Sequence, residues 1–167
     1  MNLLATPSKA VSKQVPQFQR NTAFKVGKTT DQAPGIGATV DWNVVVYDLG
    51  TNFNLVTNKY VVPYQGLYTY DVTLEGRSND NPFIANVLLA LFSQSGEEIR
   101  GTINIPNAGL NDRFTISMSG SHVFNKDDQI EVVVASGGNM TIFGTNGGAV
   151  CCYWTMYRVE AESRTVL

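Results

Sequence analysis

The chain has 167 residues, of which 43% are hydrophobic and only 16% are charged. This composition fits one compact domain and excludes a disordered, coiled-coil or nucleic-acid-coating protein. Twelve Lys and Arg against fourteen Asp and Glu leave a net charge of −2, so neither nucleic acid nor an acidic membrane is expected as a partner. A single histidine, His122, and two adjacent cysteines, Cys151 and Cys152, cannot form the usual structural zinc site.

The first residues of the chain predict an extended arm. Residues 1–21 hold Pro7 and Pro16, no acidic residue and no sustained periodicity, and they contain no apolar run of the kind an export signal needs. The arm carries a charge of +3, which subtracted from −2 leaves −5 on the other residues. Ordering such an arm costs on the order of 20 to 40 kcal/mol of backbone entropy, so the arm can be ordered only where it lies against a large surface. We expect that surface to belong to another chain, with folding back onto its own body as the alternative. The predicted anchoring residues are Lys9, Lys13, Phe18 and Arg20.

After the arm, runs of β-branched and aromatic residues alternate with clusters of Gly, Asn and Asp, which predicts strands and turns. No segment has the pattern of a long amphipathic helix. About ten strands at this spacing predict an all-β fold, either a two-sheet sandwich or a jelly roll. The predicted strands are Ala23–Val26, Val40–Tyr47, Lys59–Val62, Gly66–Glu75, Phe83–Ser93, Thr102–Ile105, Arg113–Phe124, Gln129–Ala135, Met140–Phe143 and Ala149–Val159.

Three of these strands have no clearly hydrophilic face. They are Ala149–Val159, Gln129–Ala135 and, over residues Phe83–Phe92 and apart from Asn86, the strand Phe83–Ser93. A monomer that exposed so much apolar area would aggregate, so the pattern predicts a homo-oligomer in which a whole sheet packs against copies of itself. Loops that cover the second face are the alternative. Neighbouring residues on a strand point to opposite faces, so Cys151 and Cys152 are predicted to be reduced, packed thiols.

The segment from Tyr60 to Tyr70 reads Tyr-Val-Val-Pro-Tyr-Gln-Gly-Leu-Tyr-Thr-Tyr. In it, Pro63 and Gly66 favour a turn, and Tyr68 and Tyr70 then fall on one side of a strand, where their rings fill a core. The segment is similar to Phe-x-x-Pro-x-x-Gly-x-Tyr-x-Phe in the globular head of complement C1q and its tumour-necrosis-factor-like (TNF-like) relatives. Other matches at the same spacing are Ala23-Phe24-Lys25-Val26, Trp42-Asn43, Tyr47-Asp48, Phe53-Asn54 and Thr57-Asn58-Lys59-Tyr60.

The resemblance covers about residues 22–160 and leaves 161–167 as a C-terminal tail. It implies a ten-stranded C1q/TNF-like jelly roll that assembles as a homotrimer around one sheet. The sequence departs from the family at Asp127, where Gly is usual, and in the last strand, which lacks the usual Phe-x-Gly. The residues expected in the trimer core and interface are Tyr68, Tyr70, Tyr153, Trp154 and Met156.

Enzymatic chemistry has little support in the sequence. His122 and the nearby Ser119 and Ser121 point to opposite faces of a strand and lack a nucleophile elbow, so no catalytic residue and no enzyme is predicted. Surface rings could form a carbohydrate platform, for which the candidates are Tyr47, Phe53 and Tyr64.

Two clusters of acidic and amide side chains could either bind a metal ion or be ordinary turn residues. Oxygen ligands suited to Ca²⁺ occur in two clusters, and some members of the family bind calcium near the trimer axis. Neither spacing matches a defined calcium loop, so solvated turn residues are the favoured interpretation and no cofactor is predicted, with an unlocated calcium ion as the alternative. The clusters are Asp127, Asp128 and Glu131, and Asp80 with Asn79 and Asn81.

These features combine into one hypothesis, a non-enzymatic virion structural protein of bacteriophage type. We expect a trimeric capsid decoration (cement) protein or head-fibre knob, made in the host cytoplasm without a signal peptide. Its arm would bind the major capsid protein or another virion protein by strand addition and charge complementarity. The alternative is a receptor- or carbohydrate-binding module, such as a fibre tip or lectin. Its loops near Ser78–Pro82 and Asn107–Asp112 would then contact a target such as a host-surface glycan.

Overall fold

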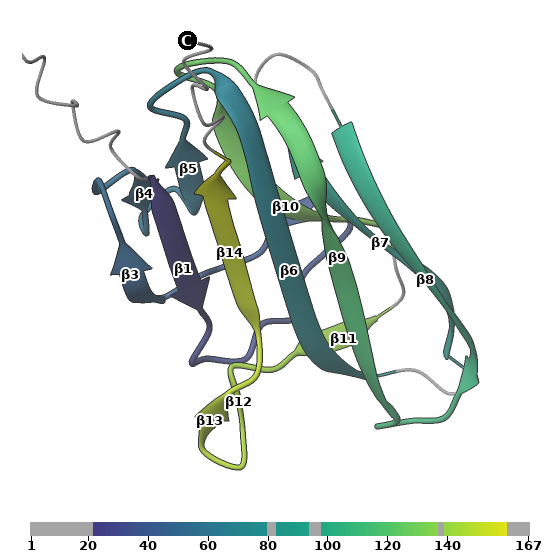
Figure 1. The fold of residues 1–167 in the computed structure, drawn as a ribbon. Helices are drawn as coiled ribbons and strands as arrows, with labels where there is room; N and C mark the ends of the chain where they lie inside the picture. Colours follow the sequence, from purple (N-terminus) through teal and green to yellow (C-terminus); the bar gives the residue numbers. More distant parts are fainter. Residues whose placement is uncertain (1–21, 80–82, 94–97, 137–138, 160–167) are drawn as a thin grey trace, which may run out of the picture.

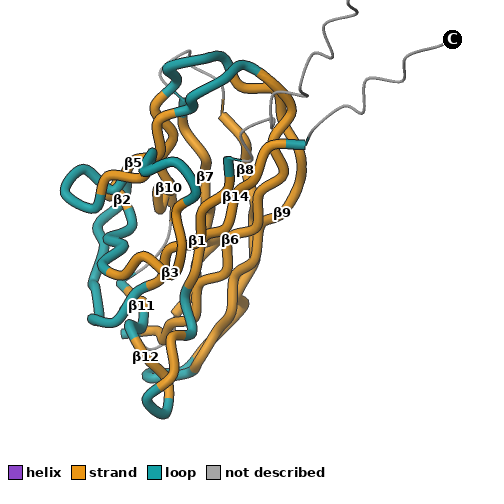
Figure 2. Tube along the Cα trace, turned by 60° about the vertical axis from the view of Figure 1, so that its left-hand side comes forward, coloured by secondary structure: helices purple, strands orange, loops and turns teal. Residues whose placement is uncertain are grey.

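The computed structural model describes residues 22–79, 83–93, 98–136 and 139–159. These residues form antiparallel strands and turns without a helix, so none of them is a candidate for a membrane-spanning helix. The strands lie in two facing layers (Figures 1 and 2). The predicted arm, its four anchoring residues and the predicted C-terminal tail lie outside the described residues.

One layer, sheet A, has β3, β1, β14, β6 and β9 side by side, and β11 pairs with the end of β6. The longest pairing joins β6 to β9, in register from Gly66–Phe124 to Arg77–Arg113. The strands of sheet A are β1 (Ala23–Gly27), β3 (Val44–Asp48), β6 (Gly66–Ser78), β9 (Arg113–Phe124), β11 (Met140–Ile142) and β14 (Tyr153–Arg158).

The other layer, sheet B, has the order β4, β5, β10, β7 and β8, with β2 paired to β10. A separate hairpin of two short strands, β12 (Thr145–Asn146) and β13 (Ala149–Val150), projects from one end of the molecule (Figure 1). The strands of sheet B are β2 (Ala38–Thr39), β4 (Phe53–Asn54), β5 (Lys59–Val61), β7 (Phe83–Phe92), β8 (Glu98–Ala108) and β10 (Gln129–Ser136).

Aromatic side chains from both sheets interlock in the core. Phe24 of β1 stacks on Tyr60 of β5 with ring centroids 4.5 Å apart, and the edge of Trp154 of β14 meets Phe24 at 4.9 Å. Tyr68 of β6 is fully buried, and its hydroxyl donates to the carbonyl of Tyr64 at 2.8 Å. Because these rings come from strands of both sheets, their packing fixes how the two sheets lie on each other.

The all-β jelly-roll class is confirmed. Several predicted bounds differ from the observed ones, as at Thr102–Ile105, which is the centre of the longer strand β8, and two predicted strands differ most. The segment Val40–Tyr47 becomes a strand only at Val44, because the Trp42 amide donates to Asn58 Oδ1 at 2.7 Å instead of joining a ladder. The segment Ala149–Val159 is broken at Cys151 and Cys152. The unpredicted strands β2, β4 and β12 have only two residues each, too few to show a periodicity.

The second apolar face of β10 is covered within one chain. Val132, Val133 and Val134 are consecutive and all buried, so both faces of the strand are out of water at this point. Val133 lies opposite Ala90 of β7, which is also fully buried. In this part of sheet B, the apolar pattern therefore requires no second copy of the chain.

Candidate assembly face

The side of sheet A that points away from the core is called here the outer face of sheet A. Along β14, Trp154 and Met156 are fully buried, whereas Tyr153, Thr155 and Tyr157 alternate with them on the outer face. The registers of β1, β14, β6 and β9 align outer-face residues in cross-strand rows. Three successive rows are Ala23–Tyr157–Thr69–Ser121, Lys25–Thr155–Asp71–Ser119 and Gly27–Tyr153–Thr73–Ser117.

Hydroxyl groups dominate the centre of this face, and several are already paired. Thr69 Oγ1 and Ser121 Oγ lie 3.0 Å apart, and Thr73 Oγ1 and Ser117 Oγ lie 3.3 Å apart. A hydroxyl with a hydrogen-bond partner in its own chain loses less free energy when it leaves water. These paired hydroxyls can therefore be covered by another surface at modest cost.

A shallow hollow of about 530 Å³ lies in this centre. Tyr70 and Gly120 of β9 border this hollow, but the Tyr70 ring belongs to the core side of the sheet, where it reaches across Gly120. A Cβ atom at position 120 would lie 2.5 Å from the Tyr70 hydroxyl oxygen, so only glycine leaves room for the ring. Burial raises the pKa of Tyr70, because removal from water disfavours the charged phenolate. The remaining lining residues are Lys25, Thr69, Asp71, Ser119, Ser121, Tyr153, Thr155 and Tyr157.

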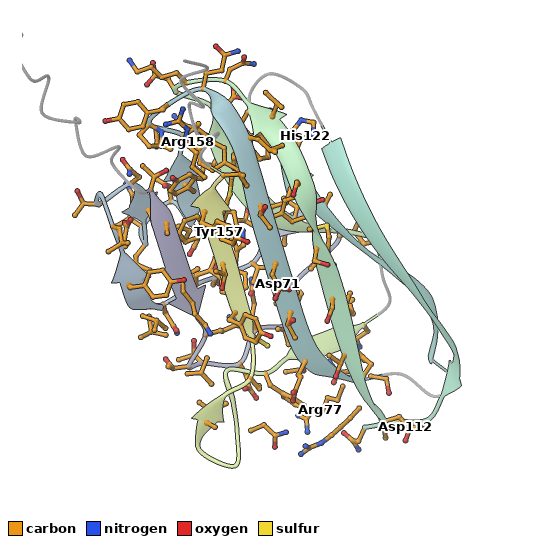
Figure 3. The ribbon with its side chains drawn as sticks, in the orientation of Figure 1. Asp71, Arg77, Asp112, His122, Tyr157 and Arg158 are labelled. Atoms are coloured by element: carbon orange, nitrogen blue, oxygen red, sulfur yellow. The ribbon has the colours of Figure 1, made fainter. Side chains whose placement is uncertain are left out.

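The two ends of the outer face differ in chemistry. At one end, Leu67 of β6 and Val123 of β9 lie directly opposite each other and are 41% and 54% exposed. At the other end, Arg77 lies opposite Arg113, whose Nη1 donates to Asn146 Oδ1 at 3.1 Å. Figure 3 labels Asp71 near the middle of β6 and Arg77 toward this charged end. The face therefore runs from apolar, through hydroxyl-rich, to charged.

The five residues predicted for the trimer core and interface lie on both sides of sheet A. Tyr68, Trp154 and Met156 are fully buried in the core of a single chain, and Tyr70 is 5% exposed. Tyr153 lies on the outer face, where the Lys25 ammonium is 4.6 Å from its ring centroid. Only Tyr153 is thus placed where another chain can reach it.

The sequence interpretation missed several residues of the outer face. Lys25, Leu67, Asp71 and Val123 alternate with core residues along β1, β6 and β9, and this alternation is the signal that could have found them. The family pattern consists mainly of aromatic residues, which lie in the core, so it led to core residues being predicted for the interface.

The three predicted carbohydrate-binding rings do not form one platform. Phe53 packs inside, 5.2 Å from Phe24, and Tyr64 faces the Arg158 guanidinium at 5.6 Å. Tyr47, 38% exposed, lies opposite Lys25 at the edge of sheet A.

The residues weighed and rejected for catalysis, His122 against Ser119 and Ser121, lie on opposite faces of β9. His122 packs edge-on against Phe124 at 4.9 Å on the core side, whereas Ser121 bonds to Thr69 on the outer face. No nucleophile and base are therefore brought together here.

The carboxylates considered as alternative calcium ligands have other partners. Glu131 pairs with Lys59 Nζ at 3.2 Å, and Asp127 with Lys126 Nζ at 3.6 Å. Asp128 is buried and accepts the amide of Asn125 at 2.9 Å. Among the residues that the structure describes, no group of three or more His, Cys, Asp or Glu could hold a metal ion. Asp80 and Asn81 lie outside the described residues.

The two loops predicted for recognition are joined at their described ends. The Ser78 amide donates to the Asp112 carbonyl at 3.0 Å, and the Asn111 amide donates to the Ser78 carbonyl at 2.9 Å. The Ser78 hydroxyl also bonds to the carbonyl of Gly109. Leu110, 55% exposed, lies between these bonded residues, so the loops form one surface at one end of the molecule.

Comparisons of the fold give a consistent result. The chain is similar to Eiger TNF from S. frugiperda, with a TM-score of 0.66 and 12% identity over 88% of this chain and 98% of that one. It is also similar to murine APRIL at pH 5.0, with a TM-score of 0.59 and 13% identity over 83% and 99%. A third similar structure, the globular domain of zebrafish complement 1qA protein, has a TM-score of 0.55 and 13% identity over 81% and 94%.

The fold is a C1q/TNF-like jelly roll. No family model matches the sequence, and no curated protein matches it. At such low sequence identity the likeness concerns the fold, so function has to be argued from the chain's own surfaces.

Proposed function

We propose that this protein is a non-enzymatic jelly-roll module that assembles as a homotrimer through the outer face of sheet A. The proposal rests on the composition of that face. Its central rows hold hydroxyls and tyrosines with only one lysine and one aspartate, and its apolar end exposes Leu67 and Val123. Interfaces between proteins are depleted in charge and enriched in tyrosine, whereas a free surface normally carries many charged residues.

The apolar end supplies the driving force for association. Tyr157 is 48% exposed and Val159 39%, and the Val159 amide donates to the Leu67 carbonyl at 2.8 Å. Together with Leu67 and Val123, these residues extend an apolar band across β14, β6 and β9. Burying exposed apolar area is worth about 25 cal/mol per Å², so three such bands stabilise each other when they meet. The proposal requires no metal and no cofactor.

Sedimentation velocity at micromolar concentration tests this assembly. The molecular mass of the sedimenting wild type should be three times the chain mass of 18.2 kDa. Val123→Asp should be a folded monomer, because it places a charge in the apolar band. The matched control is Val56→Asp, in the turn between β4 and β5, where the side chain is already 91% exposed. A monomeric wild type, or a trimeric Val123→Asp variant, would contradict the proposal.

We propose further that the trimer is a virion component, a capsid decoration protein or head-fibre knob. The support is the basic arm of residues 1–21 on an acidic body, which suits binding to a particle protein through opposite charges. Deleting residues 2–20 should abolish binding to the particle and leave the trimer intact. Particle binding that survives the deletion would count against this role.

A receptor- or carbohydrate-binding module is the second candidate, favoured by the bonded loops at Ser78 and Gly109–Asp112. The exposed Leu110 and Asn111 are the residues to vary, since neither fills the core. Loss of glycan or host-cell binding in Leu110→Ser, with the trimer retained, would favour this candidate. Unchanged binding would exclude this loop as the recognition surface.

A further inference from the structure

Two opposite charges on the outer face of sheet A have no ionic partner among the residues that the structure describes. Lys25 of β1 and Asp71 of β6 are both half-buried and both line the central hollow. The Lys25 ammonium lies over the ring of Tyr153, at 4.6 Å from its centroid. The ion pairs found within the described part of the chain join other residues, as in Lys59–Glu131.

The register keeps the two charges on different halves of the face. Lys25 lies opposite Thr155, and Thr155 lies opposite Asp71, so β14 separates them. Adjacent strands are about 4.8 Å apart, which places β1 and β6 roughly 10 Å from each other. The cation therefore belongs to the half that contains β1, and the anion to the half that contains β6 and β9.

We infer that Lys25 of one copy and Asp71 of the next copy form the ion pair that closes a ring of three chains. The inference rests on the proposed homotrimer and names its contact. In a three-membered ring, every interface joins two different parts of the surface, so one copy must offer the cation where its neighbour offers the anion. Lys25 and Asp71, on opposite halves of one face, meet this requirement.

Desolvation favours a second copy over a neutral ligand. Covering the face would strip water from both charges, and an unpaired buried charge costs several kcal/mol. A neutral sugar could stack on Tyr153 and bond to the hydroxyls, but it would leave both charges without a counter-ion. A neighbouring copy supplies a carboxylate for the lysine and an ammonium for the aspartate at every interface.

Charge reversal tests the contact in the full-length protein. Lys25→Asp and Asp71→Lys each place like charges together and should raise the trimer dissociation constant by roughly 10- to 100-fold or more. The double variant exchanges the two charges and should return the dissociation constant to within about threefold of the wild type. The matched control reverses Lys126 and Asp127, an exposed ion pair in the turn before β10, and should have no effect.

Near-UV circular dichroism of the buried Trp42 and Trp154 shows whether each variant keeps the core. If a reversal variant fails to fold, Lys25→Gln and Asp71→Asn replace it, with the same direction expected. Two outcomes overturn the inference and leave the homotrimer standing. In the first, the wild type is a trimer and neither reversal raises its dissociation constant. In the second, the double variant dissociates as readily as the single variant that forms the weaker trimer. A monomeric wild type overturns both. Binding of a soluble glycan to that monomer, lost in the Lys25 and Asp71 variants, would assign the face to carbohydrate.

Discussion

The two faces of sheet A are built by the same strands and differ almost completely in composition. On the core face, Phe24, Tyr68 and Trp154 are fully buried and interlock with aromatic rings of sheet B. On the outer face, their sequence neighbours Lys25, Thr69 and Thr155 line an open hollow. A single-residue alternation therefore separates the surface that holds the monomer together from the surface that we propose holds the trimer together.

The core face and the outer face of sheet A depend on different interactions. Core packing depends on shape, because ring edges and faces must fit at centroid distances of about 4.5 to 7 Å. The outer face depends on paired hydroxyls, an apolar end and two complementary charges. Substitutions on the core face should therefore change the stability of folding, whereas those on the outer face should change association.

The largest expected effect comes from truncating the core face at Trp154. Trp154→Ala should lower the free energy of unfolding by about 3 to 5 kcal/mol, because it leaves a cavity beside Phe24 and Phe53. Thr155→Ala, one residue along on the outer face, should cost about 0.5 kcal/mol or less. Urea unfolding at one fixed protein concentration measures both, and equal costs would break the distinction between the faces.

Gly120→Ala should have the next largest effect, because the new Cβ would meet the Tyr70 hydroxyl oxygen at 2.5 Å and Cζ at 3.0 Å. We expect a loss of about 1 to 3 kcal/mol from this overpacking. Tyr70→Phe removes the nearer atom, so the double variant should recover part of the loss in a thermal or urea unfolding cycle. A double variant less stable than Gly120→Ala would show that the clash lies elsewhere.

The two adjacent cysteines should contribute differently to the pH dependence of stability. Burial raises the pKa of the Cys152 thiol to about 12, from its ordinary value of 9.0. Since folding favours the protonated thiol, its contribution to stability is complete below pH 9. It is then lost between pH 9 and 12 by up to about 1.4 kcal/mol per pH unit.

Cys152→Ala should therefore flatten the fall in unfolding free energy over this range, measured against the wild type by urea titration at each pH. Burial also raises the pKa of Cys151, but its side chain is only partly buried, so Cys151→Ala should flatten the curve less. A thiol reagent at neutral pH should modify Cys151 first and Cys152 only on unfolding. Faster labelling of Cys152 would contradict its placement in the core.

The smallest expected effect is in a turn that belongs to neither face. Asp127 has a φ of 69°, a left-handed conformation that glycine adopts without strain. Asp127→Gly should raise the unfolding free energy by at most about 1 kcal/mol, because relief of strain is partly offset by the greater entropy of the unfolded chain. A loss of stability would show that the exposed ion pair with Lys126 matters more than the backbone.

Local patterns in the sequence predicted much of the fold. The run from Tyr60 to Tyr70 predicted a turn and a core-facing strand, and Arg113–Phe124 was predicted with its observed bounds. The break at Cys151 and Cys152 could not be predicted, because it depends on a distant segment. The Glu75 amide donates to Cys152 Sγ at 3.1 Å, and the Lys28 amide donates to the Cys152 carbonyl at 3.2 Å.

The candidate face was less predictable than the fold. The sequence shows that Lys25 and Asp71 alternate with core residues, but it does not show that they share a hollow with Tyr153. That proximity requires β1, β14 and β6 to pair in a particular register, although they are far apart along the chain. Likewise, the apolar second face of β10 suggested a partner chain, and only the three-dimensional packing shows Val133 and Ala90 buried within one chain.

The sequence by itself determined the all-β class, the positions of most strands and which residues of each strand share a face. These properties follow from local sterics and from a two-residue periodicity that short segments carry on their own. Tertiary structure decided which apolar face lies inside the monomer, where the last strand breaks and which charges line the same hollow on the outer face of sheet A. Those outcomes depend on the register between strands distant in sequence, which is set by the packing of the whole core rather than by any one segment.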